Sequence, residues 1–279
     1  MRLGVDDGGT KIEVAVLGTD GSEVMRRRIA TPHRDYNAAL RTLAEHILAG
    51  EKEAGARCTI GVGMPGLIDP ATGVVANAYN TPYNNRPLKP DLEKILGRET
   101  RFANDANCFA LSEAVDGAAR GARVVFGAIL GTGVGGGIVV ERRALDGCHG
   151  IAGEWGHTPL PWMSDEEHPG PLCNCGRRGC LEQFISGPAK NRDRDRIGEE
   201  AAMRLFEDRL ARAFGMMINI LDPDMIVVGG GVSKHAEIYA NVAPLLRKYV
   251  YHREPHTPIV RAAHGDASGV RGAAMLWPV

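Results

Sequence analysis

The chain contains one structural unit twice: a short apolar strand, a glycine-rich turn and a second strand. Residues 2–17 form the first copy around Gly8 and Gly9, and residues 124–140 form the second around Gly131–Gly137. An internal repeat of this kind predicts two copies of one supersecondary unit. Because 279 residues also correspond to about two domains of roughly 150 residues each, we expect two similar α/β domains.

Hydrophobic periodicity predicts the remaining elements. The expected strands are 2–5, 12–17, 23–29, 58–62, 124–130, 138–140 and 225–228. The expected helices are 36–54, 88–96, 106–117, 199–221, 235–249 and 269–276. Segment 149–187 is rich in Gly, Pro and Cys, so we expect an irregular loop there.

Composition and charge exclude several classes of protein. The chain has 44% hydrophobic and 24% charged residues, which is typical of a globular protein. With 33 basic and 34 acidic residues the net charge is −1, so we expect no nucleic-acid and no membrane partner. The start of the chain has no apolar segment typical of a signal peptide, and no run approaches the ~18 apolar residues of a membrane span, so we expect a cytoplasmic protein.

The glycine turns are candidates for phosphate binding. Glycine backbone N–H groups can approach phosphate oxygens, and neighbouring Thr and Lys side chains add donors. A plain hairpin turn is the simpler alternative for each, and Gly131–Gly136 also matches a dinucleotide-binding pattern. That pattern requires a helix directly afterwards, whereas 138–140 continues as a strand. Two such loops, together with Gly229–Gly231 before a predicted helix, favour a nucleotide site.

Three of the six cysteines are clustered in the predicted loop. Cys173, Cys175 and Cys180 follow His157, which lies sixteen residues before the first of them. Three thiolates and one imidazole suit tetrahedral Zn²⁺, and four protein ligands leave no open position, so the metal would be structural. Buried free cysteines are the alternative. The other cysteines are interpreted as core or incidental thiols: Cys58, Cys108 and Cys148.

A set of motifs in order resembles the bacterial ROK family. The motifs are Gly4-Val5-Asp6 with Gly8-Gly9-Thr10-Lys11, Asn104-Asp105-Ala106-Asn107, Leu130–Gly137, Ala152–His157, Cys173–Glu182 and Ser186-Gly187. The resemblance implies the actin-like/hexokinase ATPase fold, with two ribonuclease-H-like α/β domains around a cleft. We expect a small domain from 1–105 plus 265–279, and a large domain from 106–264 with the zinc-binding loop.

Within the family, the resemblance implies a kinase. The first glycine motif begins at residue 4, which leaves no room for the DNA-binding domain of the family's repressors. Segments 154–163, 221–224 and 265–274 look most like a fructokinase of the manno(fructo)kinase type. The expected reaction is therefore ATP-dependent phosphorylation of D-fructose at its 6-hydroxyl, by a homodimer. N-acetylglucosamine kinase, glucokinase and a non-enzymatic sugar sensor with the same fold are the alternatives.

The resemblance also implies residue roles. Asp105 would accept the proton of the sugar hydroxyl, with a helix cap as its alternative role. The expected sugar ligands are Gly66, Asn104, Asp105, Glu154, His157 and Glu182, with Asn77 and Asn80 as further candidates. The expected ATP contacts are Gly8, Gly9, Thr10, Lys11, Thr132, Gly133 and Gly230. Asp6 would meet Mg²⁺, and His157 with Cys173, Cys175 and Cys180 would hold Zn²⁺.

The chain departs from the family pattern at two places. Asp7 stands where an apolar residue is usual, so it either disturbs the packing of the first loop or adds charge beside the metal. After Gly187, residues 188–196 pass directly into the predicted helix 199–221, where a longer stretch is expected. The alternatives are a deletion or missing residues of a mobile loop.

Overall fold

The computed structural model describes residues 1–31 and 35–277, and their strands form two large sheets and one small one. The strands are β1 (Arg2–Asp7), β2 (Lys11–Leu17), β3 (Glu23–Ala30), β4 (Thr59–Met64), β5 (Leu67–Ile68), β6 (Val75–Ala76), β7 (Arg101–Asn104), β8 (Val124–Leu130), β9 (Val134–Val140), β10 (Arg143–Ala144), β11 (Met225–Gly229) and β12 (Ile259–Arg261). The large sheets have the orders β3-β2-β1-β4-β7 and β10-β9-β8-β11-β12. In each, three antiparallel strands are extended by two parallel ones. The internal repeat therefore covers a whole five-stranded sheet.

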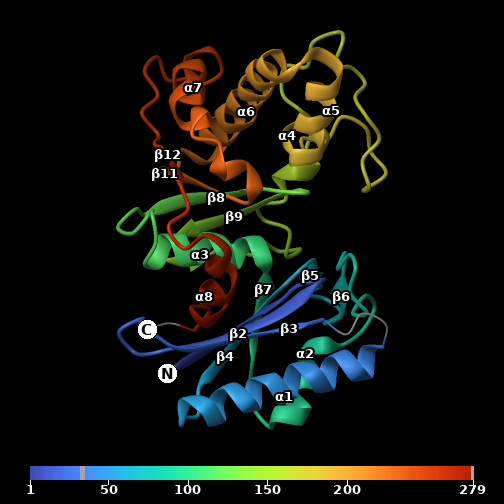
Figure 1. The fold of residues 1–279 in the computed structure, drawn as a ribbon, viewed down its shortest axis with the longest axis vertical. Coiled ribbons are helices and arrows are strands. Elements are labelled where there is room, and N and C mark those ends of the chain that lie inside the picture. The colour runs from blue at the N-terminus through green and yellow to red at the C-terminus, as the bar shows by residue number, and fades with distance from the viewer. Residues whose placement is uncertain (32–34, 278–279) are drawn as a thin grey trace.

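Helices cover the sheets and fill the space between them. They are α1 (Tyr36–Ala54), α2 (Leu88–Leu96), α3 (Asp105–Val115), α4 (Glu182–Ile185), α5 (Gly187–Ile197), α6 (Glu199–Leu221), α7 (Glu237–Leu245) and α8 (Ser268–Ala274). In Figure 1, α1 and α2 lie on the outer side of the first sheet, α4 to α7 lie beyond the second, and α3 and α8 lie between the two sheets. In the described ranges, no helix combines the length and apolarity needed to cross a membrane.

Local sequence explains where the well-predicted helices begin and end. Asp35 caps α1, because its Oδ1 accepts a hydrogen bond of 2.6 Å from the Ala38 N–H. Gly55 ends α1 in the left-handed region at φ +65°, which glycine adopts at little cost. The buried faces of α1 and α6 each carry apolar residues at helical spacing, so their bounds match the prediction.

Several glycines bring the central helices close to their neighbours. A Cβ on Gly61 in β4 would lie 1.8 Å from the Ala273 carbonyl oxygen, and one on Gly272 in α8 would lie 1.7 Å from that of Cys108 in α3. These distances are far shorter than a van der Waals contact. Part of the glycine excess therefore serves helix packing, and only part serves the turns at the candidate phosphate site.

A buried carboxylate joins the two central helices, α3 and α8, to the chain that returns between the two bodies of the molecule. The first body is the sheet β3-β2-β1-β4-β7 with α1 and α2, and the second body is the sheet β10-β9-β8-β11-β12 with α4 to α7. Glu113, near the end of α3, accepts hydrogen bonds from the N–H groups of Ala118, Ala263 and His264 and from the Ser268 hydroxyl, at 2.8–3.1 Å. Its side chain is fully buried. Glu113 thus fixes the C-terminal part of α3 to the start of α8.

The structure differs from the predicted elements in the second half of the chain. The predicted helix 235–249 is shorter in the structure: α7 covers Glu237–Leu245 and a 3₁₀ turn follows at Leu246–Lys248. A separate 3₁₀ turn at Gly231–Lys234 precedes α7. The glycines at 229–231 therefore precede a short 3₁₀ turn and not an α-helix. Segment 188–196 forms most of α5, and only Gly198 separates it from α6.

Candidate active site

A cavity of about 1000 Å³ lies where the two bodies face each other. Its wall combines residues 65–67 after β4, Asn77 and Tyr79 after β6, the start of α3, and residues of the second body. The predicted site residues among its lining are Gly66, Asn77, Asp105, Thr132, Gly133, Glu154, His157, Cys175 and Glu182. One cavity thus brings together side chains that are more than a hundred residues apart in the sequence.

Asp105 lies at the junction of β7 and α3. Asn104, the last residue of β7, is the helix N-cap: its Oδ1 accepts from the Ala106 N–H at 2.8 Å, and its Nδ2 donates to the Gly66 carbonyl oxygen at 3.0 Å. Asn104 is thus the N-cap, and Oδ1 of Asp105 accepts from the same Ala106 N–H at 2.8 Å, so Asp105 also contributes to the helix start. Burial raises the pKa of Asp105 to about 6, and the negative charges of Asp6 and Glu154 add to that rise.

Trp155 holds the two site residues on either side of it. Its Nε1 donates to the Gly135 carbonyl oxygen at 2.8 Å, and its ring stacks on Phe214 with centroids 5.7 Å apart. Glu154 and His157 flank this buried ring and line the cavity. Burial raises the pKa of Glu154, His157 lowers it, and Glu182 raises it.

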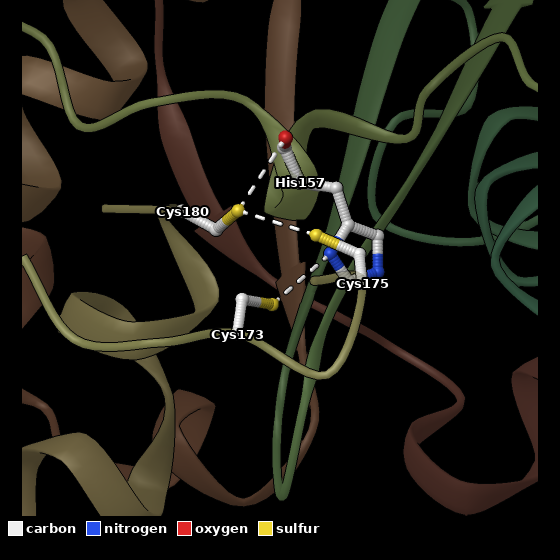
Figure 2. Close-up of side chains that lie close together, drawn as sticks. All are labelled: His157, Cys173, Cys175 and Cys180. Carbon is white, nitrogen blue, oxygen red and sulfur yellow. Dashed lines mark hydrogen bonds between the residues drawn. The ribbon is translucent and has the colours of Figure 1, made fainter. Parts of the chain in front are cut away.

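The four predicted zinc ligands lie together (Figure 2). One ligand atom from each of His157, Cys173, Cys175 and Cys180 lies within 4.8 Å of all the others. Nδ1 of His157 is 3.5 Å from Sγ of Cys173, and the sulfurs of Cys175 and Cys180 are 3.5 Å apart. A tetrahedron with Zn–S bonds of ~2.3 Å has edges of about 3.8 Å, so the four residues fit this metal.

Glu182 links the cysteine cluster to the second glycine turn. One carboxylate oxygen accepts from the Val134 N–H at 3.1 Å, and the other lies 4.0 Å from Sγ of Cys173. The Gly187 N–H also donates to the Gly131 carbonyl oxygen at 2.8 Å. The cysteine loop and the second glycine turn are therefore held against each other at the cavity.

The first glycine turn lies outside the cavity lining. The Gly8 N–H donates to the Lys11 carbonyl oxygen at 2.9 Å, and Gly9 packs against Asn80. The side chain of Lys11 pairs with the buried Glu13 at 3.0 Å. Five of the seven predicted ATP contacts are not in the lining: Gly8, Gly9, Thr10, Lys11 and Gly230. Asn104 and Asn80 are also outside it.

Asp6 and Asp7 point to opposite faces of the first sheet. Asp6 lies against Gly269 at the start of α8, and burial raises its pKa to about 6. One carboxylate together with phosphate oxygens is a usual Mg²⁺ environment, so Asp6 fits the role expected of it.

Asp7 occupies the core of the first body. Its side chain is fully buried, and neither oxygen has a hydrogen-bond partner of acceptable geometry among the described residues. Burial raises the pKa of Asp7 to about 7, and the neighbouring Tyr83 hydroxyl partly offsets this rise. Asp7 therefore places an unsatisfied carboxyl group in an otherwise apolar core.

Some lining residues were not predicted from the sequence. Tyr79 follows the predicted candidate Asn77, while Asn174 and Arg177 lie between the cysteines. Arg177 lies within the cysteine motif that the sequence analysis singled out, so the motif marks its neighbourhood but not the direction of its side chain. Tyr79 carries no such signal.

Comparisons with known proteins agree with this geometry. The ROK family model matches residues 2–279. N-acetyl-D-glucosamine kinase of Pectobacterium atrosepticum is 38% identical, over 99% of this chain and 98% of the relative. The ROK hexokinase of Thermus thermophilus superimposes with a TM-score of 0.86 at 31% identity, covering 99% and 97% of the two chains. A ROK glucokinase from Streptomyces griseus, solved with glucose and AMPPNP, has a TM-score of 0.79 at 27% identity over 99% and 98%. The chain therefore belongs to the ROK family, and its two similar sheets form the actin-like/hexokinase ATPase fold.

Proposed function

We propose that this chain is an ATP-dependent sugar kinase that phosphorylates N-acetyl-D-glucosamine at its 6-hydroxyl. The observation that carries the proposal is the position of Asp105, a buried carboxylate in a cavity that residues of both bodies line. Relatives that match almost the full chain at 37–38% identity are named N-acetyl-D-glucosamine kinase. These relatives support the alternative of an N-acetylglucosamine kinase and give no support to the expected fructokinase.

In the proposed reaction, Asp105 accepts the proton of the sugar 6-hydroxyl while the hydroxyl oxygen attacks the γ-phosphorus of ATP. The bond between the γ-phosphorus and the bridging oxygen breaks, and ADP leaves. Phosphoryl transfer depends mainly on positioning and charge stabilisation. Glu154, His157 and Glu182 would hold the sugar hydroxyls, because carboxylates and imidazole each make directed hydrogen bonds.

The phosphates of ATP would lie between the two glycine turns. Thr132 and Gly133 already line the cavity, and the turn at Gly8 and Gly9 would reach the phosphates when the two bodies close. Bound Mg²⁺ would neutralise phosphate charge, and Asp6 would hold it. Lys11 is engaged with Glu13, so we assign it no phosphate contact.

Zinc would have a structural role in this proposal. His157 would use Nδ1 for the metal, and its other ring nitrogen points away from the sulfurs (Figure 2). That nitrogen is then available to a sugar hydroxyl. The metal would keep Glu154, His157 and Glu182 in fixed positions. Groups that surround a site commonly orient the residues that contact the ligand in this way.

A coupled assay of ADP release tests the activity and the sugar together. The substrates are N-acetylglucosamine, glucose, mannose and fructose, each with ATP and Mg²⁺. We expect kcat/KM for N-acetylglucosamine to exceed that for fructose by about tenfold or more, since about 1.4 kcal/mol from contacts to the acetamido group corresponds to a factor of ten. No turnover of any sugar would reject the kinase, and a preference for fructose would reject only the substrate. Light scattering tests the homodimer, which stays a prediction.

A further inference from the structure

A second cavity, of about 890 Å³, opens between the two bodies and shares no lining residue with the candidate active site. The first body contributes Arg2 and the residues around the start of β7. The second body contributes the turn between β9 and β10. The wall is completed by the last turn of α3 and by Trp277 near the end of the chain.

The lining of this cavity is rich in positive charge. Five basic residues line it: Arg2, Lys89, Arg101, Arg142 and Arg143. Three acidic residues oppose them: Glu99, Glu141 and Asp146. Among the described residues, Lys89 is the one member of the basic set with an ion pair, at 2.6 Å from Glu93. Nη1 of Arg2 is buried and has no hydrogen-bond partner in the described part of the chain. Among the described residues, none of the four guanidinium groups forms an ion pair, and five basic against three acidic residues leave the lining a formal charge of +2.

Part of the cavity wall is rigid before any ligand binds. The guanidinium of Arg101 lies 4.2 Å from the ring centroid of Trp277 and donates from Nη1 to the Leu276 carbonyl oxygen at 2.8 Å. Nε1 of Trp277 donates to the Ile60 carbonyl oxygen at 2.7 Å. These contacts hold one charge and one aromatic surface in fixed positions, which lowers the entropy lost on binding.

The turn between β9 and β10 presents two more of the charges. Glu141 and Arg142 have φ values of +50° and +61°. Both positions of this two-residue hairpin turn thus require the left-handed conformation, where Asn and Gly are preferred. The chain instead places Glu and Arg there, directly before Arg143, so charge is kept at this turn in spite of the conformational cost.

We propose that this cavity binds a small phosphorylated metabolite and that its occupancy changes the activity at Asp105. Guanidinium groups recognise phosphate through charge-assisted hydrogen bonds, and the volume is that of an ordinary small-molecule site. The indole of Trp277 and the side chain of Phe102 provide an apolar surface beside the charges.

The chain connects the two cavities directly. Arg101 and Phe102 line the second cavity, and Asn104 and Asp105 follow in the same strand and helix. Leu111, on the same helix as Asp105, lies about two turns farther along and also lines the second cavity. Because residues of both bodies form the wall, a ligand that binds open and closed states with different affinity shifts the balance between them.

The test measures binding of three probes by titration calorimetry: inorganic phosphate, a hexose 6-phosphate and ADP. The proteins are the full chain and the double variant Arg142→Ala/Arg143→Ala, with Arg41→Ala on the exposed face of α1 as the matched control. We expect at least one probe to show a binding event that weakens tenfold or more in the double variant and is unchanged in the control. The three probes distinguish phosphate alone, a sugar phosphate and a nucleotide.

Steady-state kinetics test the coupling. The probe that binds should change kcat in the full chain by a mechanism that is not competitive with ATP or sugar, and this effect should be lost in the double variant. Equal binding of all probes to both proteins would overturn the site, and binding without a kinetic effect would overturn the coupling. The calorimetric result requires no turnover, so it stands apart from the proposed function.

Discussion

At the scale of single residues, Asp105 combines burial with a neighbouring negative charge. Its pKa of about 6 keeps the carboxylate mostly ionised at neutral pH, with greater basicity than an exposed aspartate. Because the base acts in its ionised form, kcat/KM should fall as the pH drops below about 6 and level off above it. A pH–rate profile of kcat/KM tests this expectation.

Removal of the carboxylate should abolish catalysis without unfolding the protein. We expect Asp105→Asn to reduce kcat by about 100-fold or more, the usual contribution of a general base. Asn104, which is the N-cap of α3, is unchanged in this variant, so circular dichroism should match the native protein. The exposed Asp165→Asn is the control, and full activity of Asp105→Asn would refute the proposed base.

Asp7 should reduce stability, because its buried oxygens have no hydrogen-bond partner among residues 1–31 and 35–277. We expect Asp7→Val to raise the free energy of unfolding by about 1–3 kcal/mol, the cost of an unsatisfied buried polar group. Asp7→Asn keeps the polarity and nearly the size, so its gain should be smaller. Urea denaturation of the three proteins measures the difference, and a less stable Val variant would show that Asp7 has a favourable partner.

The motifs predicted which residues lie at the site better than they predicted what each side chain contacts. Glu154, His157 and Glu182 were predicted to share a pocket, and they line one cavity. Lys11 was predicted to reach phosphate, yet the buried Glu13 on the same strand attracts it. Residues two apart in a strand share one face of the sheet, so the alternation of β2 allows this pair. The burial of Glu13, which makes the pair favourable, depends on the rest of the sheet and could not be read from the residues around Lys11.

At the scale of elements, the loop from His157 to Glu182 has almost no regular structure of its own. Its order depends on the cluster of four ligand atoms and on ion pairs with α6. Glu167 accepts from Arg209 and Arg212 at 2.7 Å each, and these pairs hold its pKa near 2 in spite of burial. The ligand cluster thus joins the two ends of the loop, and the ion pairs of Glu167 fix its middle to α6.

Loss of one zinc ligand should affect the sugar site more than the nucleotide site. We expect Cys175→Ser to lower bound zinc from about one ion per chain to a small fraction. The KM for sugar should then rise more than the KM for ATP, since Glu154 and Glu182 depend on this loop. Elemental analysis and kinetics provide the measurements.

Cys148→Ser is the matched control, because Cys148 is exposed and lies outside the cluster. It should retain zinc and both KM values. Native zinc content in Cys175→Ser would show that the four side chains do not hold this metal.

The longest element that the sequence analysis did not predict, α5, has a physical explanation. Residues 188–196 are almost entirely polar, so no apolar periodicity marks a helix. The helix is held by Ser186, whose Oγ accepts from the Ala189 N–H, and by Asp193, which pairs with the buried Arg209 on α6. The pair with Arg209 is a tertiary contact, which a local pattern cannot reveal. The Ser186 cap, with Pro188 in the first turn, is a local start signal that the apolar periodicity did not use. Gly198 alone separates α5 from α6, so the short segment after Gly187 consists of one helix that leads directly into the next.

At the scale of the whole molecule, the repeated strand–glycine–strand unit correctly predicted two similar sheets. The predicted assignment of 265–279 to the first domain rests on the family resemblance and stays a proposal. In the structure, α8 packs against β1 and β4 of the first sheet. Sequence periodicity alone could not predict this return, because it depends on close glycine contacts between distant segments.

The bodies should lose stability together when Glu113 is neutralised. Glu113→Gln replaces one accepting oxygen by an NH₂ group that faces backbone N–H groups. We expect it to lower the free energy of unfolding by about 2–4 kcal/mol, since hydrogen bonds to a buried charged group are among the stronger ones. Thermal and urea unfolding measure the change. The exposed Glu45→Gln on α1 should stay within ~0.5 kcal/mol of the native protein, and an equally small effect at Glu113 would contradict this role.

Arg2 and Trp277, near the two ends of the described chain, line the same cavity, so both ends of the chain lead to one region of the molecule. Chains with adjacent termini often tolerate circular permutation. A short linker between the ends, with a new start at the exposed Arg120-Gly121 turn, should therefore give a folded protein with a native circular dichroism spectrum. The linker would span the mouth of the basic cavity. Purification tags at either native end would occupy the same place, so anion titrations are best performed after the tag has been cleaved.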